Sequence, residues 1–287
     1  MILVTGATGN VGGALVSRLS QSGAQVRALV RTRERGDNLR GFDVDLAVGD
    51  YDDPEALRLA VRGADRVFLL SPSGPRMAEQ ELAVVQAVQD EAPGARVVKL
   101  AAAGFDADGE PSVRFLAAHR RVVRGLADAG LPATVLAPTS FMQNLLGQAA
   151  TVQEQGALYG AAGDGALAHV DARDVAAVAA HVLTSDGHEG ATYTITGPEA
   201  LRYAQVAQVF TSVLGKEVRY VDVPPAGLRD SLVGAGWDPW VAEGVAELSD
   251  HYRTGGAEQV TDEVEKATGR GARSLEQFLT EHRAVFG

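Results

Sequence analysis

The chain has 287 residues, of which 46% are hydrophobic and 22% charged, a globular composition that excludes disorder as its main state. The formal net charge of −11 argues against nucleic acid or an anionic membrane as the main partner, because phosphate binding needs a basic surface. Cysteine is absent, so disulfides, thiolate metal sites and cysteine nucleophiles are excluded together. The N-terminus does not resemble a signal peptide, and no run approaches the ~18 apolar residues of a membrane span, so we expect a cytoplasmic protein.

Short apolar runs alternate with helical patterns through the first half of the chain. Val11, Leu15 and Leu19 repeat every four residues and line one face of the first predicted helix. Asp53-Pro54 combines a capping aspartate with a proline at the first helical position. These repeated βα units predict a parallel sheet with helices on both faces. The predicted strands are residues 2–5, 24–30, 45–48, 66–70, 96–101 and 134–137, and two further helices cover 77–91 and 113–129.

The regular alternation ends near Asn144, and helical patterns dominate the second half. Ser274 and Gln277 form a predicted capping box at the start of the last helix. No repeat or flexible linker separates the two halves, so we expect the second to pack against the first. Helices are predicted at residues 172–183, 203–214, 240–252 and 275–285, with strands at 168–170, 192–196 and 218–223.

A glycine-rich segment lies between the first predicted strand and the first predicted helix. Its spacing is G-x-x-G-x-x-G, with Gly6 for a tight turn, Gly9 for backbone approach to a pyrophosphate and Gly12 for close helix–strand contact. The N-terminus of the helix offers free N–H groups and a positive dipole end to phosphates. The segment therefore predicts a dinucleotide site, and the alternative is a tight turn without a ligand.

The end of the second predicted strand indicates which dinucleotide is bound. An NAD site usually has an acidic residue there, whereas this strand ends in Arg31. A guanidinium suits the 2′-phosphate of NADP, and the alternative is a basic surface loop. Asp50 ends the third predicted strand and is a candidate adenine contact or an ordinary capping residue. We therefore expect NADP(H) to be favoured over NAD(H).

Several longer segments resemble the NmrA-like family of atypical short-chain dehydrogenases/reductases. They are VTGATGNVG at 4–12, VRALVR at 26–31, Gly49-Asp50, VFLLSP at 67–72, PTSFMQN at 138–144, DARDVA at 171–176 and YTITGPEA at 193–200. The resemblance covers nearly the whole chain. Within the family it is to reductases of quinones and triphenylmethane dyes, and the family also contains dinucleotide-binding regulators without known turnover.

The resemblance implies an α/β fold, with a Rossmann-type doubly wound parallel sheet and a smaller C-terminal α+β substrate domain. The NADP-binding domain is expected at residues 1–152 and 172–197, and the substrate domain at 153–171 and 198–287. The substrate is expected between them. The expected cofactor contacts are Gly6, Thr8, Gly9, Asn10, Val11, Gly12, Arg31, Asp50, Leu70, Ser71, Pro72, Ala101, Ala102, His119, Pro138 and Phe141.

The usual acid catalyst of short-chain dehydrogenases is absent. That acid is the tyrosine of a Tyr-x-x-x-Lys pair, which lies on one helix face so that the lysine lowers the tyrosine pKa. The three lysines, Lys99, Lys216 and Lys266, do not lie four residues after a tyrosine. By alignment with the family, Phe115 takes the tyrosine position and His119 the lysine position.

His119 is the candidate proton donor, because an imidazole titrates near neutral pH and also reaches a ribose hydroxyl. It shares a helix face with Phe115 and Val123, so the alternative is a buried histidine between helix and sheet. The family usually has Glu where Val123 stands and Arg where Ala137 stands. This chain therefore lacks an ion pair that its relatives are expected to have.

Polar and aromatic residues of the second half are candidates for holding a substrate. A flat aromatic substrate would suit the predicted aromatic helix face around residues 237–252, and the alternatives for each residue are helix capping, surface exposure or the core. The six histidines lack metal-site spacing, so we expect no metal. The candidate substrate residues are Phe105, Gln143, Asn144, Tyr159, Trp237 and Trp240.

These observations predict an NAD(P)H-dependent reductase that transfers hydride to a quinone-like or conjugated aromatic carbonyl substrate. A cofactor supplies that chemistry, and the protein mainly aligns it with the acceptor. One alternative is a non-catalytic redox sensor, and another is a reductase or isomerase of a polyketide-type intermediate. The expected partner is a small molecule, without nucleic acid or membrane, and the protein is expected to be a monomer or homodimer.

Overall fold

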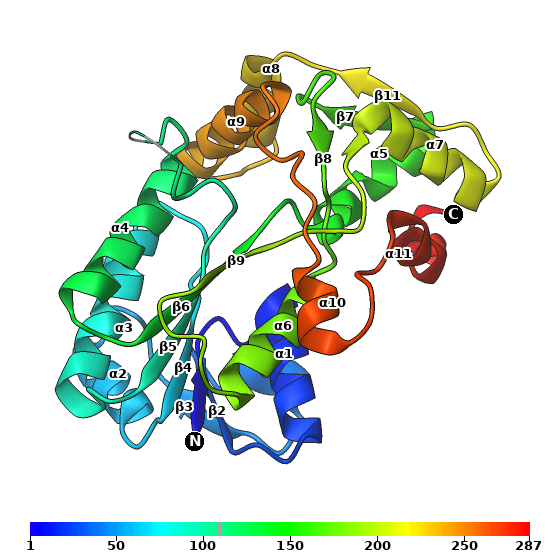
Figure 1. Cartoon of the computed structure of the whole chain (residues 1–287). Helices are drawn as coiled ribbons and strands as arrows, with labels where there is room; N and C mark the ends of the chain where they lie inside the picture. The colour runs from blue at the N-terminus through cyan, green and yellow to red at the C-terminus, as the bar shows by residue number, and fades with distance from the viewer. Residues whose placement is uncertain (108, 110) are drawn as a thin grey trace.

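The computed structural model describes residues 1–107, 109 and 111–287, and its centre is a seven-stranded parallel sheet (Figure 1). The strand order is β3-β2-β1-β4-β5-β6-β9, so the chain runs outward from β1 and then crosses to β4. In such sheets ligands bind at the carboxyl ends of the strands where the order reverses. The strands are β1 (Ile2–Val4), β2 (Val26–Val30), β3 (Asp45–Val48), β4 (Arg66–Leu69), β5 (Arg96–Leu100), β6 (Ala133–Pro138) and β9 (Thr192–Ile195).

Helices cover both faces of this sheet (Figure 1). One face packs against α1 (Asn10–Gln21), α6 (Ala172–Thr184) and the short α10 (Glu263–Thr268). The opposite face packs against α2 (Pro54–Val61), α3 (Met77–Glu91) and α4 (Arg114–Asp128). Successive strand residues alternate between the two cores, so the central strands have apolar residues on both faces. The predicted Rossmann-type sheet is confirmed.

A smaller α+β part follows the sixth strand. Its two-stranded sheets pair β7 (Ala157–Gly160) with β11 (Arg219–Asp222) and β8 (Ala166–Leu167) with β10 (Leu201–Arg202). Its core contains Leu158, Phe210 and Phe278. Within the described residues, no helix is long and apolar enough to cross a membrane.

The remaining helices of the chain are η1 (Glu34–Leu39), η2 (Met142–Gln148), α5 (Ala149–Gln155), α7 (Tyr203–Leu214), α8 (Pro225–Gly234), α9 (Pro239–Arg253), α11 (Leu275–Glu281) and α12 (Arg283–Phe286).

The secondary structure differs from the prediction in the second half. The predicted helix 275–285 is interrupted at His282, whose ring stacks on Phe278 at 4.3 Å and contacts the Phe278 carbonyl at 2.8 Å. The strand predicted at 168–170 is wrong, since β8 ends at Leu167 and Val170 makes only an isolated bridge with Phe141. The domain boundaries stay a prediction.

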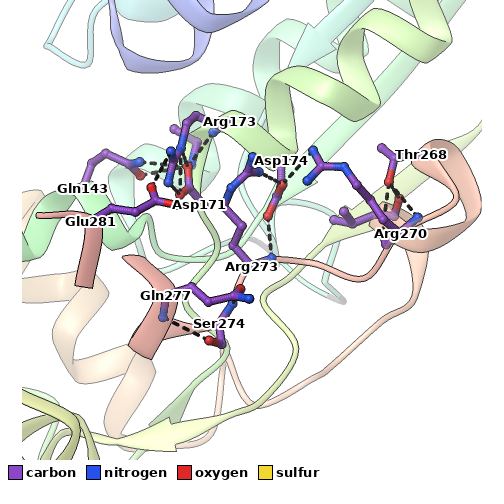
Figure 2. Close-up of polar contacts among 12 residues, drawn as sticks. Gln143, Asp171, Arg173, Asp174, Thr268, Arg270, Arg273, Ser274, Gln277 and Glu281 are labelled. Atoms are coloured by element: carbon purple, nitrogen blue, oxygen red, sulfur yellow. Dashed lines mark hydrogen bonds and ion pairs between the residues drawn. The ribbon is translucent and has the colours of Figure 1, made fainter. Parts of the chain in front are cut away.

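Two aspartates at the start of α6, the N-cap Asp171 and the first-turn Asp174, connect the C-terminal segment to the sheet (Figure 2). Asp171 caps the helix by accepting from the Arg173 N–H at 2.8 Å, and Arg173 also pairs with Glu281 of α11 at 2.6 Å. Asp174 accepts from the Arg273 backbone at 2.7 Å and pairs with its guanidinium. Both aspartates are fully buried, so these contacts tie α11 to the carboxyl end of the sheet.

Candidate functional site

The glycines of the turn between β1 and α1 serve different purposes. Gly6 has a φ of +61°, which favours glycine. A Cβ on Gly12 would lie 2.1 Å from the Gly6 carbonyl oxygen, so the turn itself requires glycine there. A Cβ on Gly9 would lie 3.5 Å from that oxygen, an ordinary contact. Gly9 and its neighbours Thr8 and Asn10 are exposed, so the bare backbone at Gly9 leaves room outside the turn for a ligand.

The N-terminus of α1 has the features of an anion site. Its N-cap is Gly9, no side chain caps it, and its first turn contains no acidic residue. The first N–H groups of a helix lack partners within the helix, and the dipole adds a partial positive charge. This 12-residue helix starts next to the Gly9 surface described above. The residues present therefore fit the pyrophosphate of a dinucleotide.

Arg31 and Asp50 lie together at the ends of β2 and β3. The Arg31 Nε is 3.6 Å from Asp50 Oδ2, and the two side chains are 56% and 47% exposed. Such an exposed pair is worth at most about 1 kcal/mol, so the guanidinium remains available to a phosphate. Asp50 also accepts from the Asp52 N–H at 3.1 Å. The predicted roles of both residues stay predictions.

The segment after β4 is held by buried polar contacts. Thr5 Oγ1 and Tyr51 Oη each donate to the Leu70 carbonyl at 2.8 Å. The N–H and hydroxyl of Ser71 donate to Glu81 Oε1 at 3.0 and 3.2 Å. Glu81 Oε2 lies 2.6 Å from Lys99 Nζ, and both of these side chains are fully buried. Two predicted cofactor residues, Leu70 and Ser71, are therefore fixed in place.

Glu81 and Lys99 were not among the residues predicted for the site. Lys99 stands inside the apolar run of β5, and Glu81 stands on the buried face of α3. A lysine in a strand buried on both faces needs a partner, because an unpaired buried charge is very costly. That rule predicts a partner for Lys99 but does not say which acid supplies it.

His119 lies on the buried face of α4 and is 9% exposed. Among the described residues its buried Nδ1 has no hydrogen-bond partner. Burial, together with the charge of Lys99, lowers the pKa of His119 well below its usual value. The imidazole is therefore neutral at pH 7. Its predicted roles as cofactor contact and proton donor stay predictions.

An apolar cluster at the ends of β5 and β6 adjoins His119. Ala137 comes from β6, Ala101 directly follows β5, and Phe105 lies in the loop after β5. Val123 and Ala137, where the resemblance leads us to expect charged residues in relatives, both belong to this cluster and pack as apolar residues. The cluster also contains Ala102, Val113, Phe115, Leu116, Val135 and Leu248.

Helix α9 packs against α4 beside this cluster (Figure 1). Trp240 meets the Phe115 ring edge-on at 5.3 Å, and a Cβ on Gly244 would lie 2.6 Å from that ring. Arg114 lies 5.5 Å from the centroid of the Trp240 ring and pairs with Glu247 at 2.7 Å. The structure thus brings one predicted substrate residue, Trp240, next to α4.

The other predicted substrate residues have various surroundings. Gln143 uses both ends of its amide, accepting from the Ala172 N–H and donating to Asp171, each at 3.0 Å. The Tyr159 hydroxyl donates to Gln155 at 2.8 Å. The structure therefore does not bring the Gln143 amide or Tyr159 into the apolar cluster. Asn144 is exposed, and Trp237 is 49% exposed just before α9.

His251 was also missing from the predicted site. It lies near the end of α9, and its buried Nε2 has no hydrogen-bond partner in the part of the chain that the structure describes. The same nitrogen lies 3.4 Å from where a Cβ on Gly104 would stand, just after β5. No motif marks this histidine, because its position depends on how α9 packs. The described residues also contain no group of three or more metal-ligating side chains.

The sheet order and the α1 N-terminus define a dinucleotide-binding α/β protein. Residues 1–282 match the family model of the NmrA-like family, and the chain belongs to that family. It is 34% identical to an NAD(P)H azoreductase of Xenophilus azovorans, covering 100% of this chain and 99% of the relative. It is 36% identical to the (4-alkanoyl-5-oxo-2,5-dihydrofuran-3-yl)methyl phosphate reductase of Streptomyces griseus, at 100% and 99% coverage.

A solved structure shows the same likeness. The NADPH complex of the quinone oxidoreductase QOR2 from Escherichia coli superposes with a TM-score of 0.89 at 28% identity. The match covers 99% of this chain and 100% of that chain. The similarity therefore extends over the sheet and the smaller part together.

Proposed function

We propose that this protein is an NAD(P)H-dependent reductase that passes hydride to a neutral quinone-like or conjugated aromatic acceptor. The observation that carries the proposal is the uncapped α1 N-terminus with a bare Gly9, on the same sheet edge as an apolar cluster around Phe105 and Phe115. Relatives named as azoreductase and quinone reductase, similar along their whole length, support the same reaction class.

The cofactor is held along the carboxyl ends of several neighbouring strands in this proposal. The N–H groups at the start of α1 bind the pyrophosphate, and Arg31 takes the 2′-phosphate, which favours NADP(H) over NAD(H). Leu70 and Ser71 line the cofactor's path from β4 toward β5 and β6, and the nicotinamide lies beside Ala101 and Ala102, which directly follow β5. The bound nicotinamide supplies the hydride.

The protein's own residues orient the acceptor and stabilise the charge that develops on it. Reduction of a quinone or an azo bond by two electrons takes one hydride and one proton. Water supplies that proton, and the ring N–H of the neutral His119 imidazole donates a hydrogen bond that stabilises the charge developing on the acceptor. Phe115 and Trp240, both partly exposed, offer flat apolar surfaces, which suit an aromatic ring and exclude water around the reacting atoms, and the buried Phe105 belongs to the same cluster.

The second candidate substrate is a conjugated lactone, favoured by the 36% identity to the dihydrofuran phosphate reductase. The substrate named there carries a phosphate, which needs a cation in the pocket. Arg114, beside Trp240, is already engaged by both carboxylate oxygens of Glu247, at 2.7 and 2.9–3.0 Å. The geometry on this side of the cluster therefore favours a neutral acceptor over an anionic one.

The test is NADPH oxidation at 340 nm with a panel containing a neutral quinone, a neutral azo dye, a sulfonated azo dye and a phosphorylated unsaturated lactone. We expect turnover with the first two acceptors and weaker activity with the two anionic ones. Absence of turnover with all four, together with equally tight binding of NADP⁺ and NAD⁺, would contradict the proposal and favour a redox sensor.

A further inference from the structure

The Glu81–Lys99 ion pair is costly for the fold and is placed beside the proposed site. Both side chains are fully buried, and a buried pair generally stabilises a protein no better than apolar residues of the same volume. The other contacts of Glu81 indicate a role in the proposed site, because its Oε1 accepts hydrogen bonds from both the N–H and the hydroxyl of Ser71. Ser71 belongs to the segment that we propose to line the cofactor.

Lys99 faces the same stretch of α4 as His119. On one side of it along β5, Val97 packs in a core with Val122 of α4. On the other side, Ala101 packs in a cluster with Leu116 of α4. Alternate strand residues share a face, so Lys99 projects between these two contacts. His119 stands between Leu116 and Val122 on the buried face of the helix.

Lys99 and His119 each have a polar group that lacks a hydrogen-bond partner. An ammonium has three N–H donors; Lys99 donates one to the Leu100 carbonyl at 2.5 Å, and its ion pair with Glu81 Oε2, at 2.6 Å, occupies a second. The third has no acceptor among the contacts of the described residues. His119 Nδ1 is buried and unpartnered in the same part of the fold. A buried polar atom without a hydrogen-bond partner is rare in native proteins.

We propose that Glu81 and Lys99 are positioning residues of the reductase site, with the third Lys99 N–H directed at His119 Nδ1. A nitrogen that accepts a hydrogen bond carries no proton, so the imidazole proton then resides on Nε2. Of the two ring nitrogens of His119, only Nδ1 is both buried and unpartnered. Nε2 is therefore the nitrogen that can face a ligand. Glu81 meanwhile holds Ser71, and one ion pair thus orders both the donor and the cofactor segment.

This inference rests on the proposed reductase function, but its first test needs no turnover. The whole protein is labelled with ¹⁵N, and the histidine ring nitrogens are observed by NMR at pH 7, with and without NADPH. His119 is assigned by the signal lost in His119→Gln. We expect a single Nε2–H tautomer of a neutral ring. A protonated ring, an Nδ1–H tautomer or an averaged mixture would overturn the inference.

The second test removes the pair without leaving a buried charge, by Lys99→Met combined with Glu81→Gln. The matched control makes the same changes in the exposed Lys266–Glu263 pair, which lies 3.0 Å apart in α10. We expect the first double variant to lose the single tautomer and about tenfold in kcat, as for a misplaced hydrogen-bond donor to the developing charge. The control should change neither.

An unchanged His119 ring spectrum in the Lys99/Glu81 double variant would overturn the inference, whatever happens to the rate. Should that variant fail to fold, the wild-type tautomer still decides the question. Failure of the reductase proposal looks different, because the wild type then oxidises no NADPH while its His119 spectrum can still be recorded.

Discussion

Gly9 and Gly12 stand three residues apart in one turn, and the turn needs only one of them for its own packing. Gly12 is enclosed by the backbone of Gly6 and Ala7, whereas Gly9 meets nothing closer than an ordinary contact. A side chain at Gly9 would instead extend from the exposed start of α1. At the scale of single residues, the fold therefore requires glycine at position 12, and the proposed ligand requires it at position 9.

The two alanine substitutions should therefore have opposite effects. Gly12→Ala should destabilise the protein by about 3 kcal/mol or more, because its Cβ overlaps backbone that cannot move aside. Gly9→Ala should leave stability nearly unchanged but weaken NADPH binding by about tenfold, equal to about 1.4 kcal/mol. Urea unfolding and fluorescence titration with NADPH measure the two quantities. Equal NADPH affinity in Gly9→Ala and wild type would contradict the proposed phosphate site.

Arg31 provides the test of cofactor preference. Arg31→Ala should weaken NADPH binding by about tenfold or more, since a hydrogen bond to a charged group is worth about 1.5–3 kcal/mol. NADH lacks the 2′-phosphate, so its dissociation constant should change little. Arg35→Ala, an exposed arginine in the following η1, is the control and should affect neither. Equal losses for both nucleotides in Arg31→Ala would refute the assignment.

At the scale of elements, the first turn of α6 joins the sheet to the C-terminal segment. Asp174 carries no solvent exposure and receives the Arg273 backbone, the Arg273 guanidinium and, at 3.8 Å, Arg270. Burial raises its pKa, and the arginine contacts oppose that rise. The arginines thus partly offset the cost of burying the carboxylate.

Asp174→Ala should consequently cost about 3 kcal/mol of unfolding free energy, the usual cost of breaking a buried charge pair. Glu55→Gln is the control, because Glu55 pairs with Arg58 at 3.8 Å on the surface and should change stability by less than about 0.5 kcal/mol. Both are read from urea unfolding curves. Similar losses for the two variants would show that the α6 contacts do not fasten the C-terminal segment.

Local patterns predicted most elements of the first half well. Asp53-Pro54, for example, starts α2, and the aspartate accepts from two N–H groups there, as a capping pattern requires. The Glu81–Lys99–His119 arrangement could not be predicted in the same way, because its residues come from α3, β5 and α4 and meet only after the sheet has formed. The interruption at His282 likewise depends on a ring contact that a helical pattern does not reveal.

At the scale of the whole molecule, the buried His169 makes the free energy of unfolding depend on pH. Burial lowers the pKa of His169 to about 4, against an ordinary value near 6.5. Between these values the unfolded chain takes up a proton that the folded protein does not accept. The free energy of unfolding should therefore fall as the pH is lowered from 7 to 5, with about 2 kcal/mol due to His169.

His169→Phe should remove that contribution while keeping the edge-on ring contact with Tyr203, which has centroids 5.7 Å apart in the wild type. The difference in stability between pH 7 and pH 5 should then shrink by about 2 kcal/mol. Urea unfolding at the two pH values measures it. The same pH dependence in wild type and variant would show that His169 takes up its proton in the folded state.

The central claim is that one edge of the sheet holds both the phosphates and the reacting ring of NADPH. A crystal structure of the wild-type protein with NADPH tests it most directly. We predict that the pyrophosphate contacts the N–H groups of residues 8–11, with nicotinamide C4 beside Ala101, Ala102 and the His119 ring. A pyrophosphate bound elsewhere, or a nicotinamide turned away from the ends of β5 and β6, would contradict the account.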